Sequence, residues 1–177
     1  KFPGGASRAK FRDYSETAAI EDAPNAQRQV LDIHVNYEME IAVQSRGKEG
    51  KSERVIPVVG GGGKFKVAVG DRGEVVGYSG TWREIDRTHS EEEVLPQEEA
   101  VKKFQKRLGR AVKLAKVETE LAYYAGPANE RQEYLAPVWV VRAEAEVEGE
   151  TVPLRNTYIA ATQYGPQFEP GTPPDPR

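Results

Sequence analysis

Residues 31–43 read LDIHVNYEMEIAV, and this stretch decides the class of fold. Every odd position from Leu31 to Val43 is apolar, whereas the even positions from Asp32 to Glu40 are polar or charged. Strict alternation with a period of two residues predicts one extended strand with a dry face and a wet face. At roughly 3.3 Å per residue the stretch spans about 43 Å, so the sheet that it joins must be long or strongly bent.

The composition argues against several classes of function. The chain has 177 residues and no cysteine, so it must bury one solid core, or two small ones, without disulfides. Its 25 Lys and Arg residues nearly balance its 28 Asp and Glu residues, which argues against a nucleic-acid surface. No apolar run approaches the roughly 18 residues of a membrane span. Because the first residue is Lys1 and not methionine, we expect an N-terminus made by processing or by design of the expressed chain.

Both ends of the chain are expected to be extended arms. Residues 1–29 are poor in large apolar side chains, although residues 15–21 are compatible with a short helical turn. Residues 163–177 are rich in proline, which predicts a polyproline II-like tail. Ends of this composition become ordered when something holds them, so the arms either wrap their own domain or lie on neighbouring copies of the chain.

Further strands are expected after the long one. Residues 45–54 are polar and charge-rich, which is typical of a loop. In the next strand, 55–59, Pro57 donates no ladder hydrogen bond and belongs at an edge or an end. Residues 64–69 and 74–82 alternate on either side of a glycine-containing turn and therefore predict a hairpin.

From Pro96 to Leu108 the apolar period changes to that of a helix. Ala100, Phe104 and Leu108 fall on one helical face. Proline is tolerated at the start of a helix, and Gly109 is a natural stop. Three predicted strands follow, over residues 114–124, 134–147 and 151–161.

The polar, acidic segment 86–95 is the predicted linker between two halves. The first half, 30–85, contains strands alone, whereas the second half, 96–162, contains the helix and three strands. We therefore expect an α+β fold with antiparallel sheets, one main helix at about 97–108, and extended N- and C-terminal arms.

The order of these segments resembles that of a known family. The residues that carry the resemblance in the first half are Val35, Tyr37, Ile56–Val58, Lys66–Val69 and Gly73–Gly77. Their strands are similar to the first part of the propeptides of thermolysin-like secreted metalloproteases. Glu98–Ala100 at the start of a helix, with three strands behind it, resembles the PepSY module that comes next in such propeptides. The similarity covers about residues 30–162.

This resemblance implies both an architecture and a role. It implies two cystatin- or PepSY-like halves in an extracellular or cell-surface module. Such a module binds and inhibits, or helps to fold, a partner or neighbouring domain. Residues 44–54 depart from the family pattern as an inserted charged loop, and Arg54 stands where a glycine is common.

No residue pattern in the chain is typical of an enzyme. Gly60–Gly63 and Lys64 are similar to a phosphate loop, but a predicted strand follows them, so no helix N-terminus orients the amides toward a phosphate. Ser79 misses the Gly-x-Ser-x-Gly elbow by one position. The alternating acids of Glu144–Glu150 are the expected solvated face of a hairpin. We therefore predict no catalytic residue and no cofactor.

The histidines and acids do not predict a metal site. His34 has Asp32 and Asn36 beside it on the wet face of its strand, but a site there needs ligands from another strand, and His89 lies in the linker. The acids of 91–99 lack the alternating ligands and the glycine of a calcium loop. Acids near a helix N-terminus are explained by the macrodipole alone.

Aromatic side chains are the candidate contacts for a protein partner. Tyr124 and Tyr134 flank the loop 125–133, where exposed tyrosines make good anchors, although both also suit a core. The terminal arms supply the other aromatic candidates. The predicted interaction residues are Phe2, Phe11, Tyr14, Tyr124, Tyr134 and Phe168.

Two hypotheses of different class follow. In the first, the chain is a non-catalytic, propeptide-like or PepSY-like module that binds a partner or neighbouring domain outside the cytoplasm. In the second, it is a structural subunit of an extracellular filament or assembly, in which a terminal arm adds a strand to an open sheet edge of the next copy. An enzyme is the least supported class.

Overall fold

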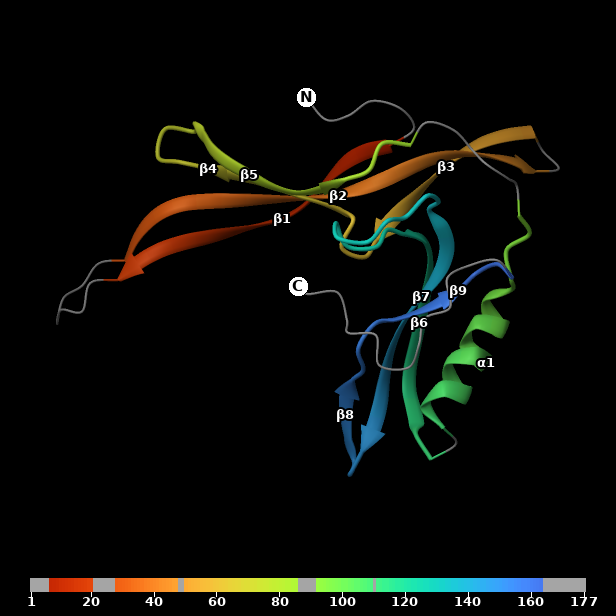
Figure 1. The fold of residues 1–177 in the computed structure, drawn as a ribbon. Helices are drawn as coiled ribbons and strands as arrows, with labels where there is room; N and C mark the ends of the chain where they lie inside the picture. The colour runs from red at the N-terminus through yellow and green to blue at the C-terminus, as the bar shows by residue number, and fades with distance from the viewer. Residues whose placement is uncertain (1–6, 21–27, 48–49, 86–91, 110, 164–177) are drawn as a thin grey trace. The chain divides into compact units, whose positions relative to one another are not determined.

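The computed structural model of the chain describes residues 7–20, 28–47, 50–85, 92–109 and 111–163 (Figure 1). Its elements are β1 (Ser7–Ile20), β2 (Arg28–Gly47), β3 (Gly50–Val59), β4 (Gly63–Val69), β5 (Val75–Trp82), α1 (Gln97–Leu108), β6 (Lys113–Tyr124), β7 (Ala136–Val147), β8 (Glu150–Pro153) and β9 (Thr157–Ala160). The described elements make a β-rich fold of the α+β class, as predicted. The chain divides into two compact units, Lys1–Asp86 with Pro127–Asn129 and Arg87–Gly126 with Glu130–Arg177.

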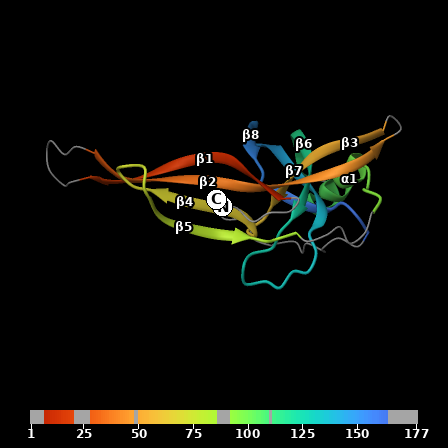
Figure 2. The ribbon, with the colours of Figure 1, turned by 90° about the horizontal axis from the view of Figure 1, so that it is seen from above.

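In the first unit, β2 is the strand on which the others assemble. It contains the alternating stretch 31–43, and β1 pairs with it along one edge. Along its other edge, β4 pairs with residues 33–38 and β3 with residues 40–47. β5 pairs with β4, and all of these pairings are antiparallel. β1, β2, β4 and β5 lie side by side in Figure 2, and the described residues of this unit form no helix that could cover them.

Residues 7–20 form a strand, so the predicted helical turn around 15–21 is wrong. β1 pairs with β2 from Ser7 to Ile20, with a shift of register between Phe11 and Asp13. A bulge of this kind inserts one extra residue and restores the pairing beyond it. Phe11 therefore lies opposite Tyr37 and Tyr14 opposite Val35, and both aromatic rings share one face although they are three residues apart. Residues 7–20 of the predicted arm are extended as expected, but they are paired with β2 of the same chain.

Two further predictions are corrected by the pairing of backbones. The expected loop at 45–54 is the end of a hairpin, because β2 and β3 remain paired as far as Gly47 opposite Gly50. A polar sequence fits a hairpin end as well as a loop, since ladder hydrogen bonds need no apolar side chains. The expected strand 151–161 is two strands, because β8 ends at Pro153 and β9 begins at Thr157. The hairpin of β4 and β5 is confirmed.

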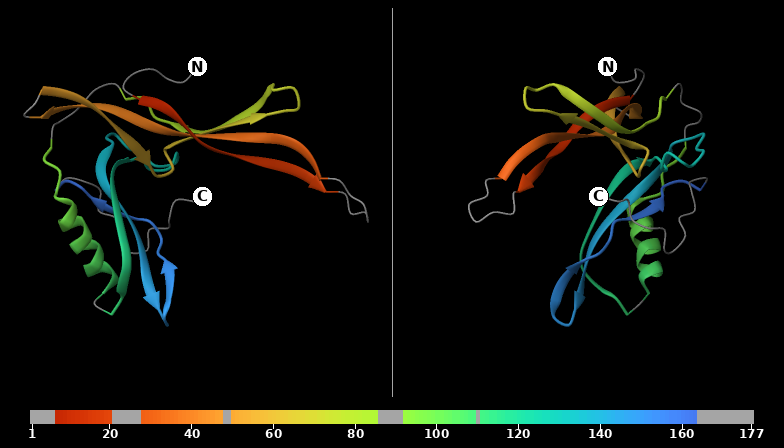
Figure 3. Two further views of the ribbon diagram at one scale, coloured as in Figure 1. Left: turned by 180° about the vertical axis from the view of Figure 1, so that it is seen from behind. Right: turned by 60° about the vertical axis from the view of Figure 1, so that its left-hand side comes forward.

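In the second unit, α1 packs on a sheet in which β7 is central (Figure 3). β7 pairs with β6 on one side and with β8 and β9 on the other. The helix follows Pro96 and ends before Gly109, as predicted. Acids in its first turn and bases in its last turn both suit the macrodipole.

The core of the second unit joins the helix to two of its strands. It consists of Ala100 and Phe104 from α1, Val141 and Ala143 from β7, and Ile159 from β9. The segment before the helix is tied to the same sheet, because the Trp139 indole N–H donates to the carbonyl of Leu95 at 2.9 Å. This unit therefore has two layers and a closed apolar interior.

Gly80 allows β4 and β5 to approach each other closely, which generates a prediction. A Cβ atom on Gly80 would lie 2.3 Å from the carbonyl oxygen of Lys64, and its φ is +147°. We expect Gly80→Ala to lower the free energy of unfolding by at least about 2 kcal/mol, because overpacking and backbone strain each cost about 1–3 kcal/mol. Urea unfolding followed by tryptophan fluorescence measures this loss.

Gly77→Ala is the matched control for that variant. Gly77 lies on the same strand, and its added Cβ would meet no atom closer than the Cβ of Ala68, at 4.0 Å. Its free energy of unfolding should stay within about 1 kcal/mol of the wild type. An equal loss in both variants would contradict the close approach at Gly80.

Candidate protein-binding surface

Three rows of directly opposed residues cross the sheet on one face, and each row takes one residue from β1, β2, β4 and β5 in that order. The first row is Phe11, Tyr37, Phe65 and Gly80; the second is Tyr14, Val35, Val67 and Tyr78; the third is Glu16, Ile33, Val69 and Val75. Directly opposed residues in an antiparallel sheet point to the same side. We call this surface the apolar face. Its one charged residue, Glu16, is paired with Arg28 at 2.7 Å.

The apolar face is open to solvent over its outer rows. The exposed fractions are 55% for Phe11, 63% for Tyr14 and 78% for Tyr78, and Ile33, Val75 and Leu31, which precedes Ile33 by two residues on β2, are exposed as well. With about 150–250 Å² for each aromatic side chain, and somewhat less for the aliphatic ones, these six residues present on the order of 600 Å². That area is at the upper end for the largest apolar patch of a monomer, and it approaches the roughly 800 Å² of one side of a standard protein interface.

Aromatic contacts hold the rings of this face in place. Phe11 meets Tyr37 edge to face, with ring centroids 6.4 Å apart, and Phe65 stacks on Tyr78 at 5.9 Å. Each pair joins two neighbouring strands, so the rings are oriented by the sheet itself. Pre-positioned aromatic side chains lose little conformational entropy on binding, which makes them effective anchors.

The opposite side of the same strands is charged and internally paired. Lys10 contacts Glu40 at 3.0 Å, Arg12 contacts Glu38 at 3.0 Å, and His34 contacts Asp32 at 2.9 Å. Ion pairs near the surface, such as those of Lys10 and Arg12, contribute little to stability, but they keep a surface hydrated. We call this side the polar face. The sheet is therefore amphipathic, with one side suited to water and the other suited to a covering layer.

The structure brings two of the predicted interaction residues together and separates them from the others. Phe11 and Tyr14 lie on the apolar face, where Phe65 and Tyr78, which the sequence analysis did not select, extend the surface. Tyr78 was missed because alternation places it in a strand without showing that this strand is uncovered. Phe2, Phe168 and His89, with most of the predicted tail, lie outside the described residues.

Tyr124 and Tyr134 belong to the second unit. Tyr134 is 57% exposed, whereas Tyr124 is partly buried and lies against Tyr158, with ring centroids 5.4 Å apart. The Gln132 amide donates to the carbonyls of both Tyr124, at 2.9 Å, and Tyr134, at 2.8 Å. The loop between the two tyrosines is thus held by Gln132, and Tyr134 alone of the pair is well exposed.

His34 and Asp32 meet on the polar face, but the described residues considered for chemistry do not converge on one site. Among the described residues, no group of three or more histidines and acids is placed to hold a metal ion. Gly60–Gly63 form a turn that leads from β3 into β4, and Ser79 lies opposite Lys66 in the β4–β5 ladder. Burial raises the pKa of the Tyr123 hydroxyl, so this group stays neutral at physiological pH.

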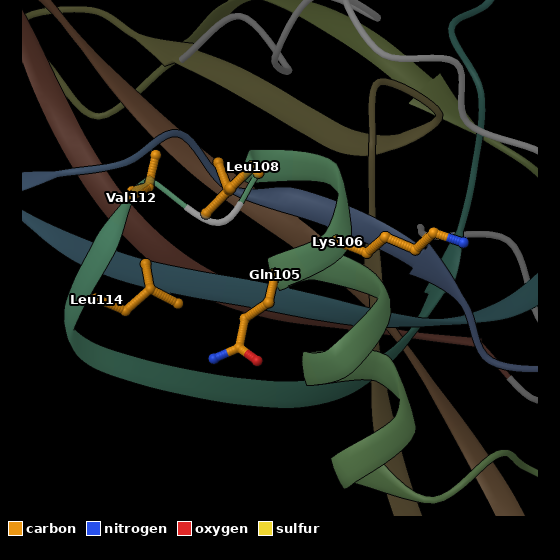
Figure 4. Close-up of a pocket in the computed structure, with 6 residues that line it drawn as sticks. Gln105, Lys106, Leu108, Val112 and Leu114 are labelled. Atoms are coloured by element: carbon orange, nitrogen blue, oxygen red, sulfur yellow. The ribbon is translucent and has the colours of Figure 1, made fainter.

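A hollow beside the helix also lacks converging polar groups. It has a volume of about 690 Å³ and is lined by Gln105, Lys106, Leu108, Gly109, Val112 and Leu114 (Figure 4). A ligand site normally combines an apolar lining with a few polar groups directed at one point. Here the Lys106 side chain extends away from the other labelled side chains, and the six described lining residues include no acid, histidine or hydroxyl group.

Comparisons with known proteins add no relative to this description. No protein-family model, no curated protein and no solved structure matches the chain. In the part of the chain that the structure describes, no helix has the length and apolar character needed to span a membrane.

The exposure of the apolar face generates a prediction about two tyrosines. The double variant Tyr14→Thr/Tyr78→Thr should lose less than about 2 kcal/mol of unfolding free energy, because exposed side chains gain little from folding. It should also bind much less of the dye 8-anilinonaphthalene-1-sulfonate, whose fluorescence reports exposed apolar surface. Urea unfolding and dye titration are the measurements.

The matched control changes the neighbouring residues on the polar face. Ser15→Thr/Ser79→Thr alters the same two strands and should leave both stability and dye binding unchanged. A loss of 3 kcal/mol or more in the tyrosine variant, which is typical of about one aromatic residue removed from a core, would show that the tyrosines are covered.

Proposed function

We propose that this chain is a non-catalytic module that binds a protein through the apolar face of its β1–β2–β4–β5 sheet. The observation that carries the proposal is the exposure of Phe11, Tyr14 and Tyr78 on one side of a sheet whose own unit has no helix among its described residues. The partner is a separate protein or a neighbouring domain that presents apolar side chains. Its contact replaces the covering layer that an amphipathic sheet needs.

The energetics favour a partner over permanent exposure. Burying on the order of 600 Å² of apolar surface on this side stabilises a complex by about 15 kcal/mol before any costs, at 25 cal/mol per Å². Association itself costs an estimated 4–15 kcal/mol, so the net affinity is set by how well the aromatic anchors fit. Phe11, Tyr14 and Tyr78 are of the residue types that dominate such interfaces.

The resemblance to propeptides and PepSY modules also implies a module that binds a protein, which is consistent with this proposal. It suggests a module that acts on a protein outside the cytoplasm, at the cell surface or in the extracellular space. The described residues of the second unit form one helix packed on antiparallel strands, and these are the element types of a PepSY-like half. Membership of this family and a location outside the cytoplasm are parts of the proposal.

The filament hypothesis receives less support from the pairing of β1. Strand donation to a neighbouring copy requires an arm that is free to leave its own sheet. Residues 7–20 pair with β2 of the same chain along the whole of β1, so the N-terminal strand is already engaged. We therefore place binding by the apolar face first.

Site-specific photo-cross-linking in cells of the natural source tests the proposal. A photoreactive phenylalanine analogue at position 14 faces the partner, and the same analogue at position 15 on the polar face is the control. We expect an adduct with a defined protein from position 14 and none from position 15. That protein, once purified, should bind the wild-type chain at least about tenfold more tightly than the Tyr14→Thr/Tyr78→Thr variant, since two aromatic contacts are lost.

Two results would contradict the proposal. One is equal cross-linking from the two faces, and the other is a purified partner whose affinity does not change in the tyrosine variant. An adduct between two copies of the chain would favour the assembly hypothesis in place of a distinct partner.

A further inference from the structure

The outer edge of β5 offers a second contact surface, distinct from the apolar face. β5 stands at the end of the strand order, and β4 is its one partner among the described strands. A strand paired on one side leaves a row of N–H and C=O groups on the other, which is a template for another strand. Most of β5 is exposed, including Val75, Val76 and Tyr78.

The two edge strands of this sheet differ in how they are protected. Each edge strand carries one bulge, at Arg12 in β1 and at Val76 in β5, but β1 also carries five charged side chains, which discourage pairing with other chains. β5 reads VVGYSGTW and contains neither a charge nor a proline. Its composition of β-branched and aromatic residues favours strand pairing. The chain thus protects one edge and leaves the other able to pair.

We propose that two copies of this chain join through β5, antiparallel, about a two-fold axis perpendicular to the sheet. In this arrangement each β5 supplies donors to the acceptors of the other, and the interface is isologous. Self-pairing meets no charge repulsion, because β5 is uncharged. The β5 strand of a second copy also has the same length as this edge, and its polar and apolar side chains alternate in the same way.

The requirement that the two apolar faces lie on the same side restricts the register. Opposed residues must then have equal parity, since they point to one side of the sheet. With Ser79 opposite Ser79 of the second copy, Tyr78 faces Gly80 across the axis. An aromatic ring over a glycine of a neighbouring strand is a recognised way to stabilise a sheet edge. The joined sheet then carries a continuous apolar face of twice the area.

This inference concerns the edge and goes beyond the proposed function, which concerns the face. Ser79→Glu tests it, because Ser79 lies on the polar face opposite Lys66. The new carboxylate can pair with Lys66 within its own chain, but it meets its symmetry mate across the two-fold axis. Ser15→Glu, on the polar face of β1, is the matched control.

Sedimentation velocity over about 1–100 µM measures the association. We expect the wild type and Ser15→Glu to form dimers and Ser79→Glu to remain monomeric, with a dissociation constant raised at least about tenfold. A wild type that stays monomeric over this range would overturn the inference, as would a folded Ser79→Glu variant that dimerises like the wild type. Circular dichroism establishes that each variant is folded.

Two further measurements separate the edge from the face and remain informative if Ser79→Glu fails to fold. Tyr14→Thr alters the apolar face on β1, far from β5. If Tyr14→Thr abolishes the dimer and Ser79→Glu does not, the two copies associate through their apolar faces. That result would overturn the edge inference and leave the apolar face as a contact surface. Hydrogen exchange of the wild type should slow in β5 with increasing concentration and stay constant in β1. Unchanged exchange in β5 would overturn the inference.

Discussion

The alternation of side chains along β2 is the constraint on which the first unit depends. Every pairing in that unit except β4–β5 includes β2, and β5 is aligned through β4. A shift of one residue in any of these ladders would move the apolar set onto the side of Asp32, His34 and Glu38. The odd positions of one strand thereby determine which residues of four strands share a face.

The two units differ in whether the chain itself covers the apolar side of the sheet. In the second unit, α1 supplies Ala100 and Phe104 to a core with Val141 and Ile159, so its sheet is covered on one side by its own chain. In the first unit, the described residues supply no such layer, and Tyr14 and Tyr78 remain open. An amphipathic sheet normally buries its apolar side; the second unit does this with its own helix, and we propose that the first unit does it with another polypeptide.

Local patterns predicted the long strand, the β4–β5 hairpin and the helix from Gln97 to Leu108, because each carries a clear period and suitable end residues. β1 escaped prediction because its bulge separates Phe11 and Tyr14 by three residues, which breaks the alternation in the sequence while preserving it in space. The end of the β2–β3 hairpin escaped because a polar ladder has no apolar period. The candidate surface was found in part, since Phe11 and Tyr14 were selected as aromatic residues of an arm. Tyr78 was not, because exposure depends on which layers are present and not on the strand that holds the residue.

Hydroxyl-radical footprinting of the isolated chain, at a concentration where it is monomeric, tests the central claim most directly. The account predicts that Tyr14 and Tyr78 are oxidised at rates close to that of a free tyrosine side chain, whereas Phe104 in the core of the second unit is protected. It also predicts that Tyr14 becomes protected when the partner of the apolar face is added. Protection of Tyr14 and Tyr78 in the isolated monomer to the same degree as Phe104 would show that the chain covers its own sheet, and would contradict the account.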